Sequence, residues 1–81
     1  MPVLAKAVRE IETAVERKQV TGGHHSRFQA VALLIREERT RIRTDASVTG
    51  ARRDAQLKRL DGVATSLAQV AAREPSFFSL L

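Results

Sequence analysis

The chain has 81 residues, with fourteen Lys and Arg, nine Asp and Glu, no cysteine and a net charge of +5. Its length allows one domain at most, and the absence of thiols excludes disulfides and thiolate metal sites. Lys6 and Arg9 interrupt the apolar run that a signal peptide needs, and no stretch approaches the ~20 apolar residues that span a bilayer, so we expect a soluble, cytoplasmic protein.

Apolar residues recur at helical spacing in three stretches of the chain. The first stretch advances in steps of four, three and four residues: Leu4, Val8, Ile11 and Val15. Pro2 suits the first turn of a helix, where its missing N–H costs nothing. We predict a helix over residues 2–18, with Gly22 and Gly23 supplying the positive φ values of a stop and turn.

Two further helices are predicted in the rest of the chain. Ser26 is a plausible N-cap for a helix over residues 27–43. Cap and turn formers cluster in residues 44–50, where we expect a break. A third helix over residues 51–73 ends before Pro75, whose ring disfavours helix at the preceding residue.

These elements predict an all-α protein, either an antiparallel helical hairpin or a three-helix bundle, over residues 1–74. A short apolar segment, residues 75–81, follows. It carries two aromatic and two aliphatic side chains: Phe77, Phe78, Leu80 and Leu81. The segment either folds back over the bundle, docks into another chain or leads into a longer polypeptide. Because a free tail of this kind would expose a contiguous apolar patch, we assign these four residues to partner binding.

The second predicted helix carries apolar residues on more than one side. Leu33 projects away from the main apolar stripe, and Leu34 lies between the two faces. Either the bundle supplies neighbours for both residues, or they form a dimer or partner surface, which is the role we predict. Arg39 lies near the centre of the main stripe. Its stem can cover the end of the bundle while the guanidinium reaches water or a carboxylate, or it can contact an anionic partner.

Positive charge is concentrated in residues 36–59, which hold four of the five net charges. If the helices run up, down and up, the amino terminus joins this region in one basic pole. Acidic residues within it favour a merely solvated charged face, but nucleic acid is the alternative partner. The missing Trp and Tyr leave few stacking platforms for single strands. The candidate contacts to an anion or nucleic acid are Arg39, Arg41, Arg43, Arg52 and Arg53.

The sequence contains no recognisable catalytic, cofactor-binding or metal-binding constellation. His24 and His25 are adjacent and would diverge on a regular element, so they indicate a polar turn. We therefore predict a non-enzymatic helical interaction module without cofactors, either a small regulatory adaptor or the helical module of a larger protein. It would bind another protein or itself, as a homo-oligomer or hetero-complex. The abundance of Ala and Arg is typical of a GC-rich bacterial or phage genome.

Overall fold

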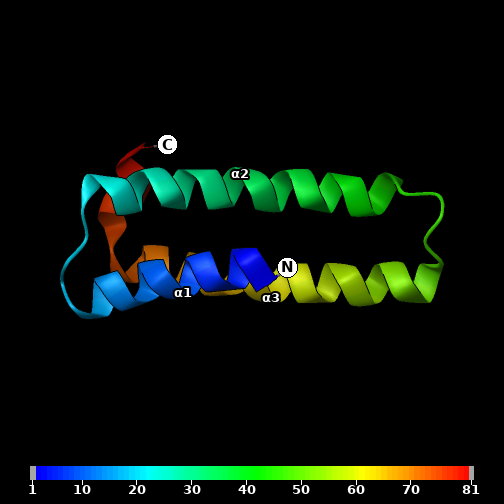
Figure 1. Cartoon of the computed structure of the whole chain (residues 1–81), viewed down its shortest axis with the longest axis horizontal. Coiled ribbons are helices and arrows are strands. Elements are labelled where there is room, and N and C mark those ends of the chain that lie inside the picture. Colours follow the sequence, from blue (N-terminus) through cyan, green and yellow to red (C-terminus); the bar gives the residue numbers. More distant parts are fainter. Residues whose placement is uncertain (1, 81) are drawn as a thin grey trace.

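A computed structural model of the chain describes the backbone of residues 2–80 and the side chains of residues 3–77. Three α-helices follow one another in the sequence: α1 (Pro2–Glu16), α2 (Gly22–Thr44) and α3 (Gly50–Arg73). A 3₁₀ helix, η1 (Pro75–Leu80), completes the fold, and the described residues contain no strand (Figure 1). The prediction of an all-α helical bundle is confirmed.

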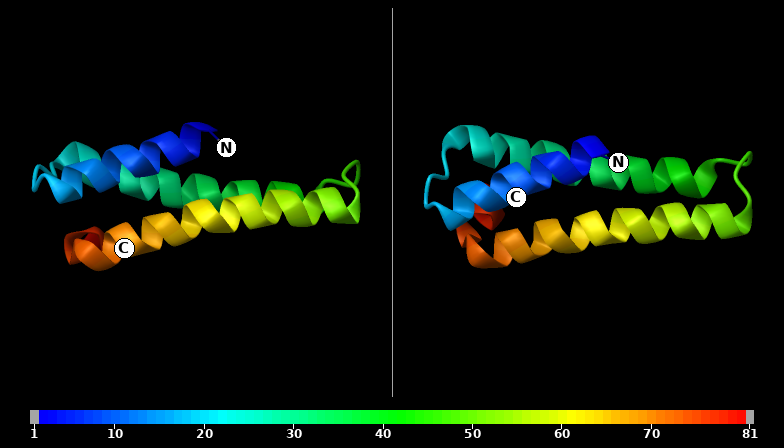
Figure 2. Two further views of the ribbon diagram at one scale, coloured as in Figure 1. Left: turned by 90° about the horizontal axis from the view of Figure 1, so that it is seen from below. Right: turned by 60° about the horizontal axis from the view of Figure 1, so that its bottom comes forward.

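Consecutive helices run antiparallel, and α2 and α3 form a long hairpin with α1 packed along one side of it (Figures 1 and 2). The three lengths are unequal, because α1 has 15 residues, α2 has 23 and α3 has 24. At 1.5 Å per residue, α1 is about 22 Å long and α2 about 35 Å. The amino end of α1 therefore lies partway along the hairpin. The expected convergence of the amino terminus with the end of α2 and the start of α3 is wrong for this reason.

Helix α1 ends at Glu16, and the turn that stops it does not use a glycine. Lys18 has a φ of 56°, in the left-handed region. The N–H of Lys18 donates to the carbonyl of Val15 at 3.1 Å, and the N–H of Gln19 donates to that of Ala14 at 2.9 Å. This pair of bonds is the Schellman pattern, which satisfies the last carbonyls of a helix. The prediction that Gly22 and Gly23 provide the stop is wrong, because Lys18 takes the left-handed position.

Helix α2 begins at Gly22, ahead of the predicted start at Arg27, and Thr21 is its N-cap residue instead of Ser26. The backbone of Thr21 is extended, with φ −118° and ψ 174°. Its N–H donates to Nδ1 of His24 at 3.0 Å. The imidazole of His24 thus accepts the hydrogen bond of the N-cap N–H. In a capping box, a Glu or Gln side chain usually accepts this bond. Gly22 and Gly23 therefore belong to the first turn of α2 and not to the loop before it.

The turn between α2 and α3 is held by side chains from both of its ends. The carboxylate of Asp45 accepts from the N–H and the hydroxyl of Ser47, at 3.0 and 2.6 Å. The Thr49 hydroxyl accepts from the N–H of Arg52 at 3.4 Å, as an N-cap of α3. The guanidinium of Arg53 donates to the carbonyls of Ile42, Asp45 and Val48, at 3.3, 2.9 and 3.2 Å. A cation from α3 therefore caps the carbonyl end of α2.

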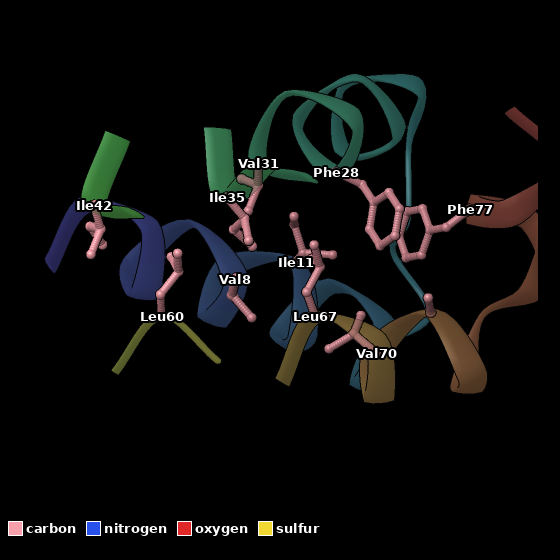
Figure 3. Packing of buried hydrophobic residues seen from close by; sticks show 11 residues of the cluster. Val8, Ile11, Phe28, Val31, Ile35, Ile42, Leu60, Leu67, Val70 and Phe77 are labelled. Atoms are coloured by element: carbon pink, nitrogen blue, oxygen red, sulfur yellow. The ribbon is translucent and has the colours of Figure 1, made fainter. Parts of the chain in front are cut away.

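The core lies between the three helices and is closed at one end by η1 (Figure 3). Its members come from every element. They are Val8, Ile11, Phe28, Val31, Ile35, Ile42, Leu60, Leu67, Val70, Ala71 and Phe77. No buried polar or charged residue is present among the side chains described. Burial of apolar area is therefore what holds this fold together.

The C-terminal segment folds back onto the bundle. Phe77 is fully buried and stacks on Phe28, with ring centroids 4.7 Å apart and an interplanar angle of 1°. Its ring also meets His25 edge to face at 5.0 Å. His25 Nε2 lies 2.9 Å from the Ser76 hydroxyl, which fixes the segment from a second side. The assignment of Phe77 to partner binding is wrong, because the bundle itself provides its pocket.

Candidate functional site

Three large apolar side chains remain exposed among those that the structure describes. They are Val3, Leu33 and Leu34, with 78%, 53% and 47% of their surface accessible. Single exposed apolar residues are common on protein surfaces, whereas contiguous ones indicate an interface. The question is therefore which of the three lie together.

Val3 and Leu34 belong to one groove, because α1 packs against α2 at this point. The groove is shallow, has a volume of about 240 Å³ and is lined by Val3, Leu4, Leu34 and Glu38. Glu38 accepts hydrogen bonds from Arg41, one turn further along α2. These bonds hold the pKa of the Glu38 carboxyl below its ordinary value. We call these four lining residues the α1–α2 groove: an apolar floor with an ionised carboxylate at one edge.

Leu33 lies apart from this groove. On an α-helix, consecutive residues point about 100° away from each other, so Leu33 and Leu34 face different directions. The turns of α2 on either side of Leu33 place exposed polar residues on the same face, among them Arg36 and Glu37. Leu33 and Leu34 were predicted to share a partner-binding role from different sides of the helix, and the structure places only Leu34 in the groove.

The remaining predicted partner contacts are in the C-terminal segment. Phe77 is unavailable to a partner because it is part of the core. The side chains of Phe78 and Leu80, and all of Leu81, lie outside the described residues. Of the predicted partner contacts, the structure places Leu34 in a groove, and the other three lining residues of the α1–α2 groove were not predicted from the sequence.

The predicted anion contacts fall into two groups, and three of the five are engaged within the chain. Arg39 pairs with Asp61 on α3 at 2.8 Å. Arg41 pairs with Glu38, and Arg53 donates to three carbonyls, one in the last turn of α2 and two in the turn that follows. Arg39 thus joins α2 to α3, Arg41 pairs within α2, and Arg53 fixes the turn.

Arg43 and Arg52 form the second group, since neither side chain has a hydrogen bond or ion pair to the part of the chain that is described. Lys58 and Arg59 share this property and are also exposed, although sequence reasoning did not select them. Arg43, Arg52 and Lys58 lie on the half of the hairpin beyond α1, whereas Arg59 lines a pocket with residues of α1 and marks the boundary. The signal that would have found Arg59 is its position seven residues after Arg52, which puts both on one stripe of α3.

Neither histidine is arranged for metal binding. His24 caps the start of α2, and His25 packs on Phe77. Over residues 2–80, no cluster of three or more His, Asp or Glu is placed to hold a metal ion. The helices within that range also include none with the length and apolar character needed to cross a membrane.

Comparison with known proteins gives one match. A family model described as "Actinobacterial helicase N-terminal four helix bundle" matches residues 1–81. No match was found among curated proteins or solved structures. The described residues agree with the helical architecture in that description, with three α-helices and the 3₁₀ helix η1.

Proposed function

Because its whole length matches that family, the chain belongs to the actinobacterial helicase N-terminal four-helix-bundle family, and from this premise we propose that it is a non-enzymatic interaction module of a helicase. In this proposal it acts in the cytoplasm of an actinobacterium. Its partner is the remainder of the helicase polypeptide, and the α1–α2 groove is where that partner docks.

The observation that carries the proposal is the exposure of Val3 and Leu34 side by side. Every buried core side chain is at most 6% accessible, whereas these two are 78% and 47% accessible and share one groove. Covering two such residues stabilises a complex by roughly 1.5–3 kcal/mol for each side chain that becomes fully buried, before the cost of association. Glu38 at the edge gives the groove a charged rim, which favours a partner with a cation at the matching position.

The test is binding of the chain to a helicase of the family from which the equivalent bundle has been removed. We expect a complex that Leu34→Glu weakens at least tenfold, because the new carboxylate would have to be buried without a partner. Leu33→Glu is the matched control. It makes the same chemical change on the adjacent residue, outside the groove, and should leave affinity within twofold.

Three results would overturn the proposal. The first is the absence of binding by the unmodified chain, and the second is equal loss of binding in both variants. The third is sedimentation of the chain alone as a dimer that Leu34→Glu dissociates, which would make a second copy the occupant of the groove. Circular dichroism of both variants establishes that they remain helical.

A further inference from the structure

The half of the α2–α3 hairpin that α1 leaves uncovered is a two-helix projection with its own charge. Val3 and Leu4, in the first turn of α1, share the α1–α2 groove with Leu34 and Glu38. The residues of α2 that follow Glu38 therefore extend beyond α1 (Figure 2). We call residues 39–59, the end of α2, the turn and the start of α3, the basic arm.

The basic arm carries the entire net charge of the protein. It contains seven cations and two acids, a net charge of +5, while all the other residues together contain seven cations and seven acids. The acids of the arm are Asp45 and Asp54. A hydrogen bond from the Ser47 hydroxyl holds the pKa of Asp45 below its ordinary value, so this acid is ionised and is committed to the turn. The remainder of the molecule is electrically balanced, and the arm alone attracts a polyanion.

Four cations of the basic arm are exposed and uncommitted within the described part of the chain: Arg43, Arg52, Lys58 and Arg59. Arg52 and Arg59 lie about 10.5 Å apart along one stripe of α3, and Arg43 comes from the end of α2. Arg53 is not among them, because its guanidinium holds the turn that keeps the two helices together. The hydrogen bonds of Arg53 thus fix the two helices of the arm relative to each other, and the four exposed cations are attached to this fixed pair of helices.

We infer that the basic arm binds the phosphate backbone of duplex nucleic acid without reading its sequence. No aromatic residue occurs in residues 39–59, so the arm has no platform on which unpaired bases could stack. A duplex presents a higher density of phosphates than a single strand and needs no stacking. This inference concerns a surface separate from the α1–α2 groove, and it holds or fails independently of the proposed function.

Fluorescence anisotropy of a mixed-sequence DNA duplex, titrated with the chain at several salt concentrations, tests the inference. Four neutralised phosphates give a slope of log K against log[salt] of about −3.6, or a loss of roughly 150-fold in affinity between 50 and 200 mM salt. The triple variant Arg43→Gln, Arg52→Gln, Lys58→Gln should reduce the slope to about −0.9. The matched control, Lys6→Gln, Arg17→Gln, Lys18→Gln, removes the same charge from exposed positions outside the arm and should retain the slope.

The inference is overturned if no duplex binding occurs at about 50 mM salt, or if the two triple variants lose affinity equally. It is also overturned if an unpaired strand with the same number of phosphates binds more tightly than the duplex. Equal binding to polyglutamate would overturn it as well, since that result would assign the arm to acidic protein surfaces. Circular dichroism confirms that each variant retains its helices.

Discussion

Replacement of Phe77 by Ala is expected to lower the free energy of unfolding by about 3–5 kcal/mol, as for other fully buried aromatic residues. The ring is 0% accessible and closes the end of the core against Phe28 (Figure 3). A domain of this size has a total stability of roughly 4–12 kcal/mol, so this loss is a large share of the total. Urea denaturation followed by circular dichroism measures the change.

A double-mutant cycle with Phe28→Ala separates the stacking interaction from the general loss of packing. We expect a coupling energy of about 0.5–1.5 kcal/mol beyond the area lost, because the rings stack with centroids 4.7 Å apart. A loss below about 0.5 kcal/mol for Phe77→Ala, the size typical of surface substitutions, would show that the segment does not fold back in solution.

Leu60→Ala is expected to cost about 2–5 kcal/mol and to lower the Tm by about 4–8 °C for each kcal/mol lost. Leu60 is fully buried in α3, and Figure 3 shows it between Ile42 of α2 and Val8 of α1. Truncation leaves a cavity where α1 meets the hairpin, because the backbones can close it only in part. Differential scanning calorimetry measures the shift.

Leu33→Ala is the matched control for this substitution, since it removes the same atoms from a side chain that is 53% exposed. It should change stability by less than about 0.5 kcal/mol. If the two substitutions had equal effects, α3 would not be packed against α1 as described.

The helical architecture was predictable because the apolar residues of each helix repeat at helical spacing, and burial of that stripe is what stabilises it. The third helix was also well delimited, because Thr49 and Pro75 flank it and act through the local backbone. Each of these signals operates over a few residues. They can therefore be recognised without knowledge of the tertiary structure.

The turn between α1 and α2 was predicted wrongly, because two residues in it take conformations or bonds that other residue types usually provide. Lys18 adopts the left-handed conformation that glycine favours, and His24 accepts the bond that a Glu or Gln normally would. The conformational cost at Lys18, of order 1–3 kcal/mol, is offset by the two hydrogen bonds of the turn. Composition alone favoured the neighbouring Gly22 and Gly23.

The candidate surfaces were only partly predictable, because they depend on contacts between distant parts of the chain. Whether Phe77 is a core residue or a free anchor depends on Phe28, and the groove at Leu34 exists because the first turn of α1 packs there. Likewise, the sequence does not distinguish Arg53 from Arg52, since both are arginines near the start of the third helix. Only the path of the turn shows that one guanidinium binds backbone carbonyls while the other points to solvent.

The central claim is that α1 packs against one half of the α2–α3 hairpin and leaves the other half, the basic arm, as two helices alone. Hydrogen exchange of individual backbone amides tests this claim most directly. Amides around Ile11, Val31 and Leu67 should exchange slowly, at rates set by global unfolding. Those of residues 39–44 and 50–58 in the basic arm should exchange faster through local opening, because α1 packs against the other half of the hairpin. Uniform protection along α2 and α3, or slower exchange in the arm than around Ile11, would contradict this account.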